Sequence, residues 1–300
     1  MKFWKKFGWF MLGLVPGIAV FWWQMLASAV GIGIYSVLRG MEAAASGIQM
    51  DVNSPEFEQY TNQITADFMS GNSYSILMFV VYIGYLVMFG LWFWLMFCRK
   101  KPTGNWKQVL KPQRIAGIIG GGIAIQFALS VALTTLLPLF PKVMESYSEI
   151  MNTLGSESVL MIICVCLLAP IGEELIFRGL TFRIMKKGIP WQAALIVQAL
   201  LFGVYHLNLV QGIYAALLGL LLGYCAHRYG SVLPGILLHM AVNSSSYLVG
   251  LVLTDSMELV PMIIVGVVAL AAAIGFLYLT VKGVKAKEFI PAEAQSIPAS

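Results

Sequence analysis

Six side chains between residues 173 and 243 are able to do chemistry together, although each lies in or beside an apolar stretch. They are two adjacent carboxylates, one guanidinium, two imidazoles and one amide: Glu173, Glu174, Arg178, His206, His239 and Asn243. A charged side chain near the centre of a bilayer costs roughly 2.5 to 3.5 kcal/mol on insertion scales, so these groups need a functional reason. Together they supply a base, proton carriers and oxyanion donors, which is the set that a hydrolytic site requires.

The two glutamates cannot share one role, because adjacent residues of a helix point about 100° apart. Glu174 and Arg178 are four residues apart on one helix face, and that spacing permits an ion pair. Glu173 then faces another wall of the bundle, where burial makes it a usable base. The alternative is a helix end with ordinary interfacial charges. Pro170 and Gly172, which loosen the helix just before the pair, weaken that alternative.

The two imidazoles have partners at four-residue spacing. Phe202 precedes His206 by one helical turn, and Asn243 follows His239 by one turn, so each pair shares a face. A lone intramembrane histidine is more often structural, and an asparagine beside it commonly joins helices. Such structural roles do not explain why polar residues occur together on three helices, and we predict that all six polar residues line one cavity. The third histidine, at position 227, is expected to be solvated.

Two kinds of hydrolytic chemistry fit these residues. Glu173, His206 and His239 are candidate ligands for a zinc ion that activates water, or Glu173 and His206 activate the water directly. The chain has no His-Glu-x-x-His pattern, so the signature of soluble zinc proteases gives the metal option no support. Zn²⁺ is therefore left open as a cofactor.

The composition predicts an all-α integral membrane protein. Hydrophobic residues make up 59% of the chain and charged residues 11%, where a soluble domain has about 25% charged residues. Since a span needs roughly 20 apolar residues, we predict about eight transmembrane helices around a membrane-embedded polar cavity. The apolar runs are 8–38, 75–98, 115–138, 158–178, 190–208, 212–226, 231–253 and 259–281. The first run is long, offers a kink at Pro16-Gly17, and is expected to be an anchor that is not cleaved.

Charge predicts the orientation of these helices. If the N-terminus is cytoplasmic, nearly all of the 19 lysines and arginines lie on the inner side, and only Arg39 and Lys142 lie outside. We therefore expect a multi-pass protein of the cell membrane with both termini in the cytoplasm. The net charge of +5 follows from these basic loops, so nucleic acid is not expected as a partner. Because Glu173 precedes Arg178 and Arg183, the cavity is expected to open on the basic, cytoplasmic side.

We expect one polytopic domain over residues 1–287. Within it, residues 158–247 form the catalytic core and residues 39–74 an acidic outer loop that is long enough to form a small cap. Residues 288–300 are expected to be a disordered cytoplasmic tail. The four cysteines lie in or beside apolar runs without a Cys-x-x-Cys pair, so we interpret them as packing residues.

Three motifs in this core resemble those of a known family. Glu173-Glu174-Leu-Ile-Phe-Arg178-Gly179, Phe202-Gly-Val-Tyr-His206 and His239-Met-Ala-Val-Asn243 are similar, in order and in spacing, to the motifs of the CAAX prenyl endopeptidase and bacteriocin-processing family. The resemblance covers about residues 158 to 247. It implies an all-helical intramembrane endopeptidase in which Glu173 and His206 activate water, while His239 and Asn243 stabilise the oxyanion.

The resemblance also implies partners and leaves alternatives. Eukaryotic members cleave after a prenylated cysteine, and bacterial relatives are associated with peptide maturation and with sensor kinases. We therefore expect the bilayer and a hydrophobic or lipidated peptide substrate as partners, with a membrane protein as a further candidate. The alternatives are a non-catalytic scaffold that regulates a partner such as a sensor kinase, and a proton-coupled transporter, for which the inverted repeats are missing from the sequence.

Overall fold

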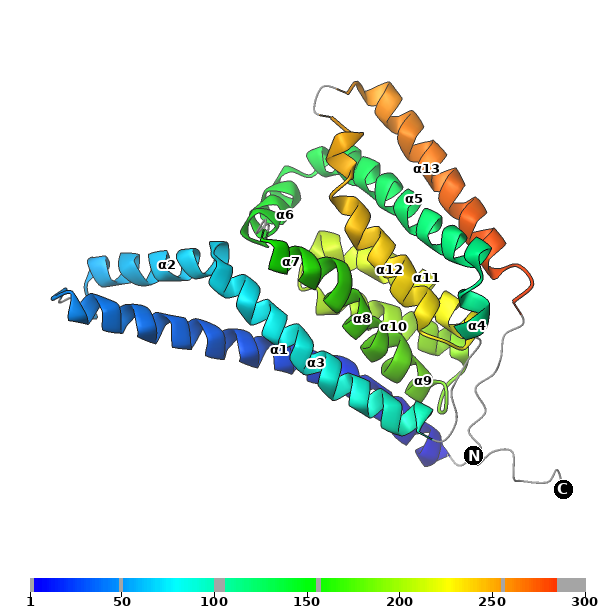
Figure 1. The fold of residues 1–300 in the computed structure, drawn as a ribbon, viewed down its shortest axis with the longest axis horizontal. Helices are drawn as coiled ribbons and strands as arrows, with labels where there is room; N and C mark the ends of the chain where they lie inside the picture. Colours follow the sequence, from blue (N-terminus) through cyan, green and yellow to red (C-terminus); the bar gives the residue numbers. More distant parts are fainter. Residues whose placement is uncertain (1–2, 49–50, 100–105, 155–157, 255–256, 285–300) are drawn as a thin grey trace.

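The computed structural model describes residues 3–48, 51–99, 106–154, 158–254 and 257–284. In this part of the chain every regular element is a helix and no strand occurs (Figure 1). The longer helices are α1 (Phe3–Ala45), α2 (Pro55–Ser70), α3 (Asn72–Phe93), α5 (Pro112–Leu136), α6 (Pro141–Leu154), α10 (Trp191–Tyr205), α11 (Leu209–Tyr229), α12 (Leu233–Ser246) and α13 (Leu259–Val281). The shorter segments are η1 (Trp94–Cys98), α4 (Trp106–Val109), η2 (Leu137–Leu139), α7 (Val159–Ile163), η3 (Cys164–Leu168), α8 (Ala169–Glu173), η4 (Glu174–Thr181), α9 (Phe182–Met185) and η5 (Val249–Leu251).

Six helical segments of the described chain are long and apolar enough to cross a membrane. They are Phe3–Ala45, Asn72–Cys98, Pro112–Leu139, Val159–Met185, Leu209–Tyr229 and Leu259–Val281. The predicted polytopic all-α class is confirmed, but the predicted count of eight spans is not. The other two expected runs contain helices of only 15 residues (α10) and 14 residues (α12). At 1.5 Å per residue each is roughly 22 Å long, which is shorter than a hydrocarbon core of about 30 Å.

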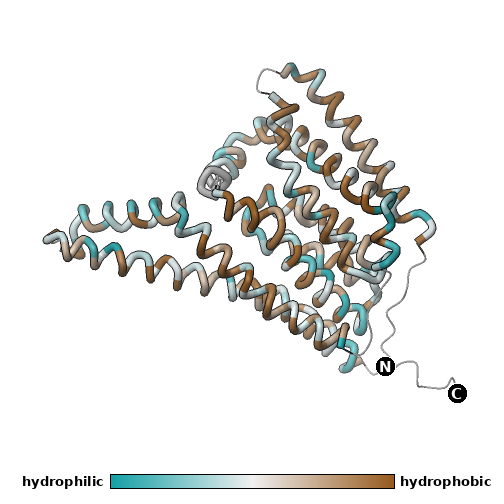
Figure 2. The backbone as a smooth tube through the Cα atoms, in the orientation of Figure 1, coloured by the Kyte–Doolittle hydropathy of each residue, from teal (hydrophilic) through white to brown (hydrophobic). Residues whose placement is uncertain are grey.

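The surface of the bundle is apolar, as a lipid-facing surface requires. Hydrophobic residues predominate along most helices, whereas α2 is mainly polar (Figure 2). Large aliphatic side chains such as Val80, Ile196 and Leu279 are more than half exposed on the outside of the bundle. A soluble protein of this size rarely exposes so large an apolar surface to water, so this surface is suited to contact with lipid.

Basic side chains join several helix ends at one end of the bundle. The Lys187 ammonium, just after α9, lies 4.3 Å from the centre of the Trp9 ring on α1. Arg114, at the start of α5, donates to the hydroxyl of Tyr229 at the end of α11 (2.9 Å). Arg228 donates to the carbonyl of Val284 beyond α13 (2.6 Å). We call this the basic end, and the opposite end, which carries α2 and α6, the acidic end.

Helix α1 differs from its expected form. It is one continuous helix of 43 residues that includes Pro16, the position at which the sequence offers a kink. At 1.5 Å per residue it is about 65 Å long, twice the thickness of a hydrocarbon core. Its C-terminal part lies beside α2 and extends from the rest of the bundle (Figure 1). The expected acidic loop 39–74 is thus largely helical, and the expected tail 288–300 lies outside the described residues.

Glycines bring the helices of the core into close contact. A Cβ added at Gly122 of α5 would lie 2.8 Å from the Leu238 carbonyl of α12, and one at Gly172 of α8 would lie 2.0 Å from the Tyr85 ring of α3. Such distances are shorter than normal van der Waals contact, so only glycine permits these approaches. They hold α8 and α12 at fixed positions between α3 and α5. The four cysteines are free thiols, three of them buried, as expected for packing residues.

Candidate active site

The first motif lies on a helical segment with unusual geometry. Residues 159–185 form a continuous series of α7, η3, α8, η4 and α9, in which η3 and η4 are π-helical. Glu173 is the last residue of α8, and Glu174 is the first residue of η4. π-Helical turns occur often at functional sites because they change which side chains share a face. Here the change falls between the two glutamates.

Glu174 and Arg178 form the expected ion pair. Arg178 Nη1 donates to Glu174 Oε1 at 2.6 Å, and both side chains are completely buried. The guanidinium also lies over the Phe202 ring, 4.4 Å from its centre. Among the described residues, however, Arg178 Nε and Nη2 and Glu174 Oε2 have no hydrogen-bond partner. A buried pair of this kind is strongly destabilised if one partner is removed.

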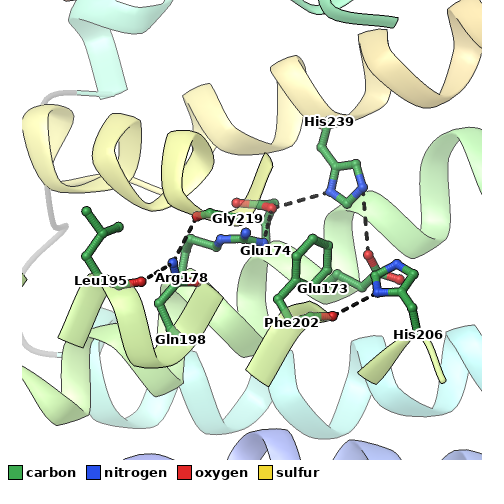
Figure 3. A network of polar contacts seen from close by, with 9 residues as sticks. All are labelled: Glu173, Glu174, Arg178, Leu195, Gln198, Phe202, His206, Gly219 and His239. Atoms are coloured by element: carbon green, nitrogen blue, oxygen red, sulfur yellow. Dashed lines mark hydrogen bonds and ion pairs between the residues drawn. The ribbon is translucent and has the colours of Figure 1, made fainter. Parts of the chain in front are cut away.

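His239 lies between the two glutamates (Figure 3). Its Nδ1 is 3.4 Å from Glu174 Oε1, and its Nε2 is 3.7 Å from Glu173 Oε2. Both distances exceed a normal hydrogen bond, but they place each imidazole nitrogen next to a different carboxylate. The imidazole of α12 therefore connects the Glu174–Arg178 pair to the carboxylate of Glu173.

His206 is oriented by the backbone of its own helix. Its Nδ1 lies 2.8 Å from the Phe202 carbonyl oxygen. Because a carbonyl only accepts, Nδ1 carries the proton of this bond, and the neutral imidazole keeps Nε2 as an acceptor. The helix α10 ends here, and the next residue, Leu207, has a left-handed conformation with φ 55°. Such strained residues cluster at active sites.

Asn243 contributes its amide from the same helix as His239. Its Nδ2 donates to the carbonyl of Val165 at 3.0 Å, which joins α12 to the π-helical segment η3. One of the two amide protons is used in this bond, so the second is available to a ligand.

One cavity of about 500 Å³ contains most of the expected site. Glu173, His206, His239 and Asn243 line it, and they come from α8, the end of α10, and α12. Glu174 and Arg178 do not line the cavity, so the prediction that all six residues line it is wrong for these two. Both side chains are completely buried and lie behind the cavity wall.

The direction of the cavity also differs from the expected one. Its wall follows the segment 159–185 through Met161, Val165, Ala169 and Glu173, at intervals of four residues, and no described residue of this segment beyond Glu173 contributes to the wall. Met161 is near the acidic end, and Glu173 forms the floor. The cavity therefore extends from Glu173 towards the acidic end. It was expected to open at the basic end because basic residues follow Glu173 closely in the sequence. The sequence does not show on which side of Glu173 the helices leave a cavity.

The donor groups do not form a metal site. Among the described residues, no group of three or more histidine, cysteine, aspartate or glutamate side chains is arranged to hold a metal ion. Glu173 Oε2 and His239 Nε2 are 3.7 Å apart. His206 Nδ1 is bonded to the Phe202 carbonyl, which leaves Nε2 as the nitrogen of this imidazole that could bind a metal. In the described part of the chain, however, Glu173, His206 and His239 are not arranged around one metal position, so they do not fit Zn²⁺.

Several residues of the site were not found from the sequence. Gln198 is fully buried and donates to the carbonyls of Leu195 and Gly219 (3.0 and 2.9 Å; Figure 3). A Cβ at Gly219 would lie 3.2 Å from Arg178 Nη2, and one at Gly235 would lie 2.3 Å from Glu174 Oε2. These two glycines make room for the ion pair. The spacing Gly219-x-x-x-Gly223 signals close helix contact, but it does not show which side chain the space is for.

His227 also differs from its expected state. It was expected to be solvated, but it is half-buried, and its ring stacks on Trp191 with the ring centres 4.2 Å apart. It lies at the end of α11 near the basic end, away from the cavity, so it is a packing residue.

Comparison with known proteins identifies the same segment of the chain. Residues 155–245 match the family model described as Type II CAAX prenyl endopeptidase Rce1-like. The match covers under a third of the chain, and it contains all three motifs. No curated protein and no solved structure matched in the other two comparisons. The resemblance predicted from the motifs is therefore confirmed for this segment, and with the apolar helices it indicates a multi-pass membrane protein in which one segment is similar to CAAX-type proteases.

Proposed function

We propose that this chain, whose residues 155–245 carry a CAAX prenyl endopeptidase domain, is an intramembrane endopeptidase. Its substrate is a hydrophobic or lipidated peptide or protein held in the bilayer. One observation carries the proposal: Glu173, His206, His239 and Asn243 line a single cavity inside a bundle whose outer surface is apolar. Polar groups at membrane depth are costly, and their convergence on one cavity supports a shared reaction.

In the proposed reaction Glu173 and His206 activate a water molecule. The carboxylate of Glu173 accepts a proton from the water while His206 Nε2 accepts a hydrogen bond from it. The Nδ1–H bond to the Phe202 carbonyl supports this role, because it leaves Nε2 as the acceptor. The water oxygen then forms a bond to the carbonyl carbon of the scissile peptide, and the carbonyl oxygen becomes an oxyanion.

His239 and Asn243 are proposed to stabilise this oxyanion. The free amide proton of Asn243 and an N–H of His239 both come from α12, one turn apart, and both residues line the cavity. When the tetrahedral intermediate collapses, the C–N bond breaks and the proton held by Glu173 passes to the leaving amine. The products are a new carboxylate and a new amine.

Glu174 and Arg178 are proposed as positioning residues. Their ion pair lies behind the cavity wall, and Glu174 Oε1 is 3.4 Å from His239 Nδ1. The pair thus fixes the imidazole whose other nitrogen faces Glu173. We further propose that the basic end faces the cytoplasm, since basic residues favour the inner side, in which case both termini are cytoplasmic and the acidic end is external.

The test is cleavage of fluorescence-quenched peptides with an uncharged apolar segment by the purified protein in detergent. Glu173→Gln keeps the size and the hydrogen-bonding capacity of the side chain but removes the base, so cleavage should fall by orders of magnitude. Glu58→Gln is the matched control, because Glu58 is exposed on α2 and does not line the cavity. If Glu173→Gln cleaves as fast as the control, the assignment of the base is wrong.

A further inference from the structure

The walls of the cavity above Glu173 carry three glutamines from three helices. They are Gln24 of α1, Gln126 of α5 and Gln211 of α11. A side-chain amide at membrane depth is costly unless it has a partner. Gln126 Nε2 donates to Ser130 Oγ at 3.1 Å, which uses one of its two amide protons. Two of the glutamines, Gln24 and Gln126, lie outside the segment that matches the family model.

A carboxamide carries both a donor and an acceptor, as a peptide group does. An extended peptide inside a membrane has unpaired N–H and C=O groups, each of which costs several kcal/mol without a partner, whereas a helix pairs its own. Side-chain amides spread over several walls therefore suit an extended segment of chain better than a helix. A peptide bond must also leave the helical conformation before water can reach its carbonyl carbon from the Glu173 side.

The other wall residues indicate the side chains that such a segment carries. Between Glu173 and the acidic end the walls are formed mainly by tyrosine, methionine and leucine side chains, among them Tyr74, Met78, Tyr147 and Leu133. Surfaces of this kind favour aliphatic and aromatic groups. They offer a cationic or anionic side chain no charge partner along the way, so a charged residue in the segment would be desolvated without compensation.

We propose that the substrate enters as an extended, uncharged segment from the acidic end, with its backbone bound by Gln24, Gln126 and Gln211. The inference rests on the proposed function and adds the conformation, the charge and the side of entry of the substrate. The scissile carbonyl then lies at the floor, next to Glu173. If the basic end is cytoplasmic, the segment is presented from the outer half of the membrane.

The experiment compares peptides that differ in one backbone group. A quenched peptide with a neutral apolar segment is tested beside the same peptide with N-methyl groups at the amides flanking the scissile bond. For the wild type, the N-methylated peptide should lose roughly two- to tenfold in kcat/KM for each lost hydrogen bond. In the Gln24→Leu and Gln211→Leu variants that discrimination should decrease, and the parent peptide itself should be cleaved more slowly. A lysine placed in the segment should reduce cleavage by wild type and by both variants.

The matched control is Gln192→Leu, the same substitution at an exposed position near the start of α10, outside the cavity. It should keep the wild-type discrimination. If Gln24→Leu and Gln211→Leu keep it as well while the wild type cleaves, the glutamines do not bind the backbone and this inference is wrong. If the wild type cleaves no peptide, the proposed function itself fails, and the inference fails with it.

The side of entry has its own test. Ser246, at the end of α12, is exposed and lines the cavity near the acidic end. A bulky thiol reagent attached to Ser246→Cys should block cleavage, whereas the same reagent on Gln192→Cys at the basic end should leave it unchanged. The opposite result would place the entrance at the basic end.

Discussion

Removing the charge of Glu174 should make the protein unfold more readily, although Glu174 itself does not line the cavity. Glu174 and Arg178 are both completely buried and are joined at 2.6 Å. Glu174→Gln leaves the guanidinium without its anionic partner, and breaking a buried pair in this way costs about 3 to 5 kcal/mol. Arg178 cannot recover much from its surroundings, because its Nε and Nη2 already have no hydrogen-bond partner among the described residues.

Thermal unfolding in detergent measures this effect. For chains of 150 to 250 residues, 1 kcal/mol corresponds to about 2 to 4 °C, and longer chains lie at the low end. For this chain of 300 residues the melting temperature should therefore fall by roughly 6 to 10 °C. The matched control is Glu173→Gln, the same substitution one residue earlier. Its closest described ion partner is His239 Nε2 at 3.7 Å, beyond hydrogen-bond length, so its melting temperature should change by only a few degrees.

The double variant Glu174→Gln with Arg178→Met separates charge from packing. It removes both charges and keeps a long side chain against the Phe202 ring, so it should recover most of the lost stability. If Glu174→Gln melts at the same temperature as Glu173→Gln, the pair is not what holds this segment together, and the reasoning from its burial is refuted.

Three further changes test the geometry of the site. Gly235→Ala places a methyl group 2.3 Å from Glu174 Oε2 and should cost about 1 to 3 kcal/mol of stability in thermal melts, whereas Gly250→Ala, with nothing within 4 Å, should be neutral. Leu207→Gly relieves a left-handed conformation and should raise the melting temperature by the equivalent of about 1 kcal/mol. Peptide cleavage should fall, because His206 is then less firmly held. An unchanged melting temperature would mean that the φ of 55° at Leu207 carries no strain. Because the donor groups among the described residues do not form a metal site, cleavage should survive dialysis against a chelator. Metal analysis should find the same metal content in the wild type and in Glu173→Gln. If the chelator abolishes cleavage and zinc restores it, Glu173 is a metal ligand.

The sequence predicted which polar side chains lie near one another better than it predicted the shape of the cavity. Spacing of four residues was enough to pair Glu174 with Arg178, because helical and π-helical turns both bring such residues together. It was also enough to place His239 and Asn243 on one face. The spacing could not show that Glu174 lies outside the cavity, since the sequence pattern is the same for a side chain behind the cavity wall and for one that forms the wall.

The walls of the cavity were the least predictable part. Gln24, Gln126 and Gln211 are separated by long stretches of sequence, and each lies in or directly beside an apolar run. Only the packing of α1, α5 and α11 around the segment 159–185 brings them to one cavity. Tyr82 and Tyr205 line the same cavity for the same reason, and no local pattern distinguishes them from other tyrosines in the chain.

The short helix α10, which is too short for a span, brings non-helical backbone to the cavity. Backbone that leaves a helix at membrane depth is tolerated only where it is buried in protein or lines a water-filled cavity. α10 ends at Tyr205, and the non-helical turn through His206 and Leu207 lines the cavity beside Glu173. Within this turn the Phe202 carbonyl is bonded to His206 Nδ1, the Gly203 carbonyl accepts from the His206 N–H, and the Val204 carbonyl accepts from the Leu207 N–H. A full-length span at α10 would have continued the helix through His206 and Leu207 in place of this turn. The shortness of α10 therefore supports the position of His206 in the cavity that the proposed reaction needs.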